Sequence, residues 1–192
     1  MYPNRNNELE VISLFRYNYK VRFYLREISK LSKLPLKTCQ NTLEKLERAK
    51  ILKSKVEGKN KYFLLNLENI KTKSYLQQAE IYLTDLFIEK YPQFKIFLKE
   101  LKTTAPIIVF GSFAKFTADK DSDLDLLVIS NKELKLPFHL LPFKPHQITM
   151  TEKTFLKAVE QQEDLIKEIE DNHIILNNHS FYVNIMWGYY GK

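Results

Sequence analysis

A Gly-Ser pair and two closely spaced aspartates lie in the segment VFGSFAKFTADKDSDLDLLVIS, which runs from Val109 to Ser130. The two acids, Asp123 and Asp125, belong to an apolar run that is typical of a β-strand. Residues two apart in a strand face the same side of the sheet, so both carboxylates would project together. Neighbouring carboxylates repel each other unless a cation lies between them, and Mg²⁺ prefers oxygen ligands. The spacing therefore predicts a magnesium site at Asp123 and Asp125.

The Gly-Ser pair adds chemistry that suits an anion. Gly111, one of only four glycines in the chain, follows the apolar run PIIVF and precedes the helical segment FAKF. The start of a helix attracts anions, and glycine lets the backbone approach a ligand closely. Ser112 offers both a hydroxyl and an amide N–H. The turn and the acids together predict a site for Mg²⁺ and the triphosphate of ATP or another NTP.

These residues resemble the signature of the polymerase-β-like nucleotidyltransferases, in particular the minimal nucleotidyltransferases. The matching positions are Gly111, Ser112, Ala114, Ser122, Asp123, Leu124, Asp125, Leu126 and Val128. The resemblance implies transfer of a nucleoside monophosphate to a protein or small-molecule acceptor. It implies that Asp123 and Asp125 are the catalytic metal ligands. It implies nucleotide contacts from Gly111, Ser112, Lys115 and Ser122.

Two positions depart from that family pattern. Phe116 stands where the family usually has a glycine after the basic residue of the short helix. Active members also carry a third carboxylate on the strand after the two aspartates. The next strand here, within KPHQITMTEKTF, has no acid before Glu152, which is expected to begin a helix. His146 on that strand could accept a proton at neutral pH or have no special role. One alternative function is therefore a nucleotide-sensing transcriptional regulator with weak or no catalysis, of antitoxin type. Another is a purely structural, dimeric DNA-binding protein.

The N-terminal part has a different pattern, with three helical segments followed by a hairpin. The segments are NELEVISLFRY, LREISKLSK and PLKTCQNTLEKLERAK, with apolar residues at helical spacing. Leu25, Ile28 and Leu31 would share one face of the second helix, and Leu36, Cys39, Leu43 and Leu46 would face inward on the third. The outward face of the third helix carries side chains that bond to bases and phosphates, namely Lys37, Thr38, Gln40, Asn41 and Lys45. Strand-like alternation on both sides of EGKN predicts a hairpin that turns at Gly58.

This order of elements resembles the winged-helix family of DNA-binding domains over residues 7–67. The resemblance implies that the third helix enters the major groove and that Lys55, Lys59 and Lys61 on the hairpin contact DNA phosphates. One departure is that Ala49 and Lys50 stand where the turn after the third helix usually has a glycine. A winged helix used only for protein contact or dimerisation is the alternative.

The basic charge of the chain is concentrated at this end. Residues 1–73 contain 17 Lys and Arg against 7 Asp and Glu, whereas the rest of the chain contains 13 against 16. Such asymmetry favours two modules, the first of which faces a polyanion. A solvated lysine-rich surface without a partner would give the same count.

The remaining segments are expected to be mostly helical. Residues 68–104 carry an apolar stripe, consisting of Leu76, Ala79, Leu83, Leu86 and Phe87 and continued by Phe94 and Phe97, that should pack on the second module or on a partner subunit. The segment TEKTFLKAVEQQEDLIKEIED predicts a helical region capped by Thr151. HIILNNHSFYVNIMW predicts a strand, a turn and a second strand. A homodimer that reads a palindromic DNA site is expected.

The sequence as a whole predicts an α+β protein, with an N-terminal winged helix and a C-terminal nucleotidyltransferase mixed β-sheet with flanking helices. The expected domains are 1–67, a helical connector at 68–104, and 105–192. A single cysteine excludes an intrachain disulfide, MYPNRNNELE has no secretory leader pattern, and no apolar run is long enough to cross a membrane. A cytoplasmic protein is therefore expected. Its expected partners are DNA, a nucleoside triphosphate and a toxin-type protein.

Overall fold

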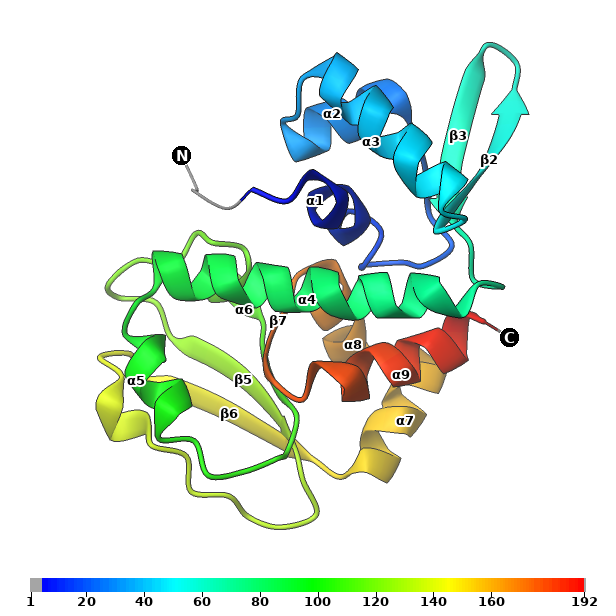
Figure 1. Ribbon diagram of the computed structural model, residues 1–192. Helices are drawn as coiled ribbons and strands as arrows, with labels where there is room; N and C mark the ends of the chain where they lie inside the picture. The colour runs from blue at the N-terminus through cyan, green and yellow to red at the C-terminus, as the bar shows by residue number, and fades with distance from the viewer. Residues whose placement is uncertain (1–4, 192) are drawn as a thin grey trace. The chain divides into compact units, whose positions relative to one another are not determined.

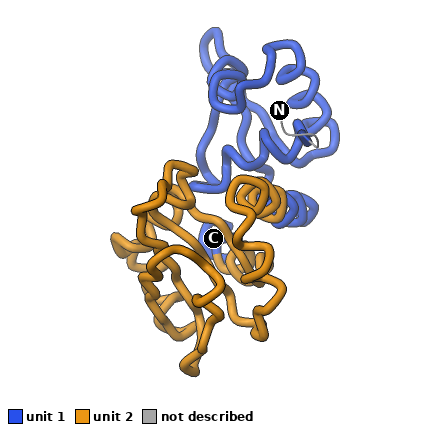
Figure 2. Tube along the Cα trace, turned by 90° about the vertical axis from the view of Figure 1, so that its left-hand side faces the viewer, with its two compact units in different colours: residues 1–79, 186–192 blue, residues 80–185 orange. Residues whose placement is uncertain are grey.

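The computed structural model describes residues 5–191, so the first four residues of MYPNRNNELE lie outside the described part. The chain forms two compact units (Figure 2). One comprises Met1–Ala79 together with Met186–Lys192, and the other comprises Glu80–Ile185. The chain therefore passes from one unit to the other twice.

The N-terminal unit combines three helices with a three-stranded antiparallel sheet (Figure 1). In chain order its elements are α1 (Asn7–Ser13), β1 (Arg22–Tyr24), α2 (Leu25–Ser32), α3 (Leu36–Arg48), β2 (Leu52–Glu57) and β3 (Asn60–Leu65). The strand order is β1-β3-β2. The three predicted helices and the hairpin are confirmed, and Gly58 has the positive φ of 59° that its turn requires. The short strand β1, which pairs with β3, was not predicted.

The core of this unit includes Cys39, Leu43 and Leu46 of α3, as their spacing predicts. Two predicted core residues are instead exposed: Leu31 and Leu36 keep 52% and 48% of their surface accessible. Leu36 is the first residue of α3, directly after Pro35, and burial begins only one turn later. The predicted inward faces of α2 and α3 were therefore too long at those ends.

The turn after α3 adopts a glycine-like conformation without a glycine. Lys50 has φ 58° and is exposed. Its carbonyl accepts hydrogen bonds from the side-chain amides of Asn66 and Asn69, each at 2.9 Å. These bonds hold the chain reversal between α3 and β2.

The second unit is a mixed four-stranded sheet with helices around it (Figure 1). Its elements are α5 (Phe94–Lys99), β4 (Ile107–Val109), α6 (Gly111–Ala114), β5 (Leu124–Ile129), η1 (Phe138–Leu140), β6 (Pro145–Met150), α7 (Glu152–Gln161), α8 (Asp164–Asp171) and β7 (Ile174–Asn177). The strand order is β6-β5-β4-β7; β5 and β6 run parallel, and the other pairs are antiparallel. The expected mixed sheet with flanking helices is confirmed.

Two helices cross the boundary between the units, α4 (Ile70–Lys90) and α9 (His179–Tyr190). The second half of HIILNNHSFYVNIMW forms α9, so the predicted second strand is wrong. The buried residues Tyr182, Val183, Met186 and Tyr190 have helical rather than alternating spacing. The N-cap Thr151 is confirmed, since its hydroxyl accepts a hydrogen bond from the Thr154 amide at 3.1 Å.

An aromatic core in the second unit connects α4, α5 and α6 with β5. Phe87, Phe94, Phe97 and Phe113 are fully buried and pack with apolar residues of β4, β5 and β7. The Phe94 and Phe97 rings lie 6.0 Å apart at 71°, an edge-to-face arrangement. Phe87, Phe94 and Phe97 of the predicted stripe thus lie in the core of the second unit, whereas Leu76 and Ala79 belong to the first unit. Burial of Phe113, the residue that follows Ser112, anchors the Gly-Ser turn to this core.

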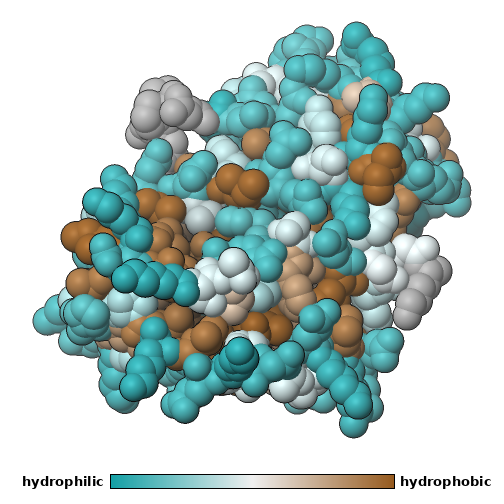
Figure 3. All heavy atoms as spheres, turned by 60° about the horizontal axis from the view of Figure 1, so that its bottom comes forward, coloured by the Kyte–Doolittle hydropathy of each residue, from teal (hydrophilic) through white to brown (hydrophobic). Residues whose placement is uncertain are grey.

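The outer surface mixes apolar and polar side chains. Figure 3 shows hydrophobic residues between hydrophilic ones on the face that it turns forward. Among residues 5–191, no helix has both the length and the apolar content needed to span a bilayer.

Candidate functional site

The Gly-Ser turn follows β4, the buried strand next to β5 in the sheet. Gly111 begins α6 with a φ of 67°, a conformation that favours glycine. A Cβ atom built on Gly111 would lie 2.4 Å from Oδ2 of Asp125. No side chain larger than hydrogen fits there unless Asp125 moves. The structure therefore brings the Asp125 carboxylate against the Gly-Ser turn.

The two aspartates lie at the start of β5. Asp123 is one residue before the strand, and Asp125 is its second residue. Their neighbours Leu124 and Leu126 are fully buried in the aromatic core, as the predicted alternation requires. The side chain of Asp123 is 53% exposed and that of Asp125 is 27% exposed. Burial of the two leucines anchors the strand while the acids stay accessible to solvent.

The parallel neighbour β6 brings two basic side chains to these acids. In the register of the two strands Asp125 is paired with His146. Nδ1 of His146 lies 3.0 Å from Oδ1 of Asp125. Lys144, just before β6, has its Nζ 3.8 Å from Oδ2 of Asp123. Its carbonyl accepts a hydrogen bond of 2.8 Å from the Leu124 amide, which aligns the start of the two strands.

Ser112 lies within α6, which has only four residues. Its carbonyl accepts hydrogen bonds from the amides of Thr117 and Ala118, at 3.0 and 3.2 Å. Its hydroxyl forms no hydrogen bond with any residue of the described chain. A single turn of helix has little dipole, so an anion here would depend on this hydroxyl and the local amides. Lys115, at the end of α6, is exposed.

Ser122 has a structural role in the loop before β5. Its hydroxyl donates to Oδ1 of Asp119 at 2.9 Å and accepts from the Asp119 amide at 3.0 Å. The hydrogen bond from Ser122 lowers the pKa of Asp119 below its ordinary value. The hydroxyl is therefore used within the loop, and it sets the conformation of the chain one residue before Asp123.

Phe116 has a backbone conformation that favours glycine. Its φ is 58°, a region that bulky residues rarely adopt. Its ring packs against Phe87 at 6.3 Å and Tyr91 at 6.5 Å between centroids. These contacts hold the strained residue in place, so the turn after α6 keeps its course.

No carboxylate of β6 completes the pair of aspartates. Glu152 is the first residue of α7, as predicted, and it does not lie on β6 beside the aspartates. Within residues 5–191 no three His, Cys, Asp or Glu side chains are grouped so as to hold a metal ion alone. Two carboxylates still fit Mg²⁺, which often binds to one or two carboxylates and completes its shell with water and substrate phosphates. Asp123 and Asp125 are the residues that would hold it.

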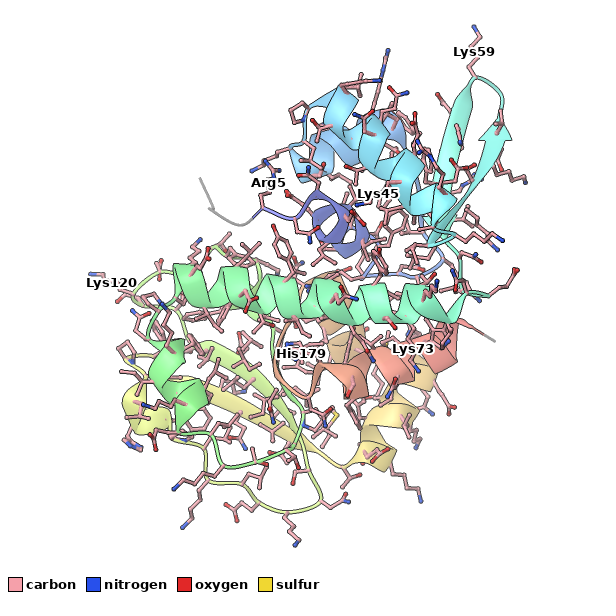
Figure 4. The ribbon with its side chains drawn as sticks, viewed as in Figure 1. Arg5, Lys45, Lys59, Lys73, Lys120 and His179 are labelled. Atoms are coloured by element: carbon pink, nitrogen blue, oxygen red, sulfur yellow. The ribbon has the colours of Figure 1, made fainter. Side chains whose placement is uncertain are left out.

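Six of the eight predicted DNA contacts line one of two hollows beside α3, and Lys37 and Lys55 line neither. Gln40, Lys59 and Lys61 line a hollow of about 710 Å³ between α3 and the hairpin. Thr38, Asn41 and Lys45 line a second hollow of about 760 Å³ beside the start of α1. Figure 4 shows Lys59 extending from the tip of the hairpin.

Several of these side chains already have acidic partners. Lys45 bonds to Glu8, which raises the pKa of Lys45. The Lys61 ammonium lies 2.7 Å from Glu47, and Lys55 lies 3.2 Å from Glu57. Gln40 donates to Glu44 at 3.0 Å. Lys37 and Lys59, by contrast, form no ion pair with the described residues, so they are the cations of this set that are available to a polyanion.

Comparison with known protein families supports the predicted nucleotidyltransferase domain. Residues 92–179 match the model of the nucleotidyltransferase domain family. The matched segment includes Gly111, Ser112, Asp123, Asp125 and His146. Neither the curated proteins nor the solved structures yielded a match to the chain.

Proposed function

We propose that this protein binds a nucleoside triphosphate with Mg²⁺ and transfers its nucleoside monophosphate to a hydroxyl of a protein or small molecule. The observation that carries the proposal is the contact between Asp125 and the Gly-Ser turn. It lies inside the segment that matches the nucleotidyltransferase family. The contact joins a metal-binding carboxylate to a turn that can bind phosphate.

The roles of the residues follow from this arrangement. Asp123 and Asp125 hold the metal, and the Ser112 hydroxyl and Lys115 ammonium contact the phosphates. The acceptor oxygen bonds to the α-phosphorus while the bond to the β-phosphate oxygen breaks, and pyrophosphate leaves. Bound Mg²⁺ supplies neutralisation of the triphosphate charge and of the departing pyrophosphate. The proton of the acceptor hydroxyl is released to solvent.

Binding and transfer need separate experiments because the acceptor is unidentified. Calorimetry should show binding of ATP or another NTP that depends on Mg²⁺ and is lost in Asp123→Asn and Asp125→Asn. An NTP labelled at the α-phosphate, incubated with a cell extract, should label an acceptor only with the wild-type protein. Binding without labelling would favour the nucleotide-sensing regulator. Binding that ignores Mg²⁺ would contradict the site itself.

A second candidate function is DNA binding by the N-terminal unit, which we propose to be a winged helix. The supporting observation is its order of helices and strands, in which β3 lies between β1 and β2 and α3 presents its outward face next to the hairpin. The concentration of basic residues in residues 1–73 adds to this. A homodimer and a toxin-type partner remain predictions.

The salt dependence of DNA binding tests this candidate. Each phosphate contact contributes a slope of about −0.9 to the plot of log affinity against log salt concentration. The double variant Lys37→Ala/Lys59→Ala should flatten the slope by roughly two. The double variant Lys153→Ala/Lys157→Ala, on the exposed face of α7, should leave it unchanged. Equal slopes in all three proteins would reject this surface.

A further inference from the structure

We infer that His146 is a positioning residue of the proposed site, which holds the Asp125 carboxylate in the orientation that binds the metal. The inference rests on the proposed function and adds a residue to it. His146 bonds to Asp125 through Nδ1, and it occupies the strand on which no carboxylate is available.

The geometry fixes Asp125 from two sides. Oδ1 of Asp125 accepts a hydrogen bond from Nδ1 of His146 at 3.0 Å. Oδ2 lies against Gly111, where a Cβ atom would be only 2.4 Å away. The backbone is fixed as well, because the Asp125 carbonyl accepts from the Phe110 amide at 3.1 Å. Rotation of the carboxylate would break the histidine bond or collide with the turn.

The strand pairing makes this contact a property of the fold. β5 and β6 run parallel with Asp125 opposite His146, and side chains at paired positions project from the same face. The His146 side chain is 65% exposed, so its ring is not buried to fill the core. A carboxylate accepts hydrogen bonds, so the Asp125 contact selects the ring tautomer with hydrogen on Nδ1. Its Nε2 atom then has a lone pair that faces away from Asp125.

Such a hydrogen bond matters because a ligand that is already oriented loses less freedom when the metal binds. Removing a residue that orients a metal ligand typically weakens metal affinity by about 10–100-fold. His146→Ala should therefore weaken metal binding by at least about tenfold. The fold should persist because the side chain is mostly exposed.

The test measures Mn²⁺ binding by the full chain in the presence of α,β-methylene-ATP, through the paramagnetic resonance signal of free Mn²⁺. A protein-free titration at the same nucleotide concentration gives the Mn²⁺ bound by the nucleotide itself, which is subtracted. His146→Asn places an amide nitrogen near the position of Nδ1 and should restore affinity to within about threefold of wild type. His146→Gln places its amide nitrogen near the position of Nε2 and should not. Thermal unfolding of each variant checks that the fold is intact.

The outcomes separate the two proposals. Asp125→Asn should abolish Mn²⁺ binding. If it does so while His146→Ala binds as the wild type does, His146 has no positioning role and the proposed site stands. Rescue by Gln and not by Asn would also overturn the inference, because it would make Nε2 the functional atom. If Asp125→Asn has no effect or the wild type binds no Mn²⁺, both proposals fail.

Discussion

At the scale of single residues, the candidate site depends on the smallest side chain in it. Gly111 has a positive φ, and a carboxylate oxygen of Asp125 occupies the space where a side chain would begin. Gly58 shares the positive φ but has nothing within 4 Å of its own Cβ position. An alanine at Gly58 would therefore introduce backbone strain alone, whereas an alanine at Gly111 would introduce both strain and a collision with Asp125.

Gly111→Ala should lower the free energy of unfolding by about 1–2 kcal/mol through backbone strain and should displace Asp125. Nucleotide–metal affinity should therefore fall by at least about tenfold. Gly58→Ala should cost similar stability without changing that affinity. Denaturant unfolding and calorimetry measure the two quantities. Unchanged affinity in Gly111→Ala would contradict the role of this turn.

Lys144 competes with the metal for Asp123 in the same site. Its ammonium lies 3.8 Å from the Asp123 carboxylate, in an exposed pair whose worth is small. Lys144→Ala should raise the affinity for Mn²⁺ in the absence of nucleotide by about twofold to fivefold. Lys153→Ala, on α7, serves as the control for loss of one positive charge. A fall in Mn²⁺ affinity would contradict the competition.

The sequence was informative about residues that are close along the chain. The Gly-Ser pair and the two aspartates were identified from their local spacing. His146 was recognised as a basic residue on the next strand, but its contact with Asp125 depends on strand register over 21 positions. Apolar alternation does not determine that register. Ser122 was singled out from the motif as a nucleotide contact, and its hydroxyl forms a hydrogen bond within its own loop, which the motif alone does not indicate.

At the scale of elements, periodicity predicted the helices and strands of the N-terminal unit except β1. That strand has only three residues, and its pairing with β3 decides its conformation. The error at α9 has another cause. Its segment contains many β-favouring aromatic and branched residues, whereas its burial follows a helical period. Tertiary packing therefore made this segment a helix despite its β-favouring composition.

The turn after α3 permits an independent test of backbone strain. Lys50 is exposed and has φ 58°, and its main-chain carbonyl is the group that Asn66 and Asn69 bind. Lys50→Gly should raise the free energy of unfolding by about 0.5–1 kcal/mol, since relief of strain exceeds the added entropy of the unfolded chain. Lys53→Gly, in β2, should destabilise the protein instead. Denaturant unfolding at equal pH and salt compares them; a loss of stability in Lys50→Gly would contradict the assignment of strain.

At the scale of the whole molecule, stability should depend on pH through a histidine at the start of α9. Figure 4 labels His179, whose Nε2 lies 3.0 Å from the Thr84 hydroxyl. Burial lowers the pKa of His179, an effect that Glu80 and Asp85 oppose in part. The imidazole of His179 is therefore protonated more readily in the unfolded chain than in the folded protein.

Lowering the pH from 7.5 to 5.5 crosses the ordinary histidine pKa of about 6.5. The unfolded chain then takes up a proton more readily than the folded one, so the free energy of unfolding should fall. His179→Asn should show a smaller fall than the wild type, whereas His139→Asn, at an exposed histidine, should behave as the wild type does. Denaturant titrations at the two pH values measure this. An equal fall in His179→Asn would refute the assignment.

The division into units was the feature least accessible from the sequence. The predicted boundaries at residues 67 and 104 follow the expected ends of the hairpin and of the helical connector, whereas the chain passes from one compact unit to the other inside α4 and again inside α9. Hydrophobic spacing along α4 runs without a break, so it contains no signal at residue 79.

The return of the chain to its first unit has a consequence for synthesis on the ribosome. Tyr190 packs against Tyr19 with ring centroids 5.3 Å apart, and both belong to the N-terminal unit. Domains made early usually fold early, as a nascent polypeptide emerges from the N-terminus. Here the partner of Tyr19 is translated about 170 codons later, after the whole of Glu80–Ile185. The unit that begins first is therefore completed last.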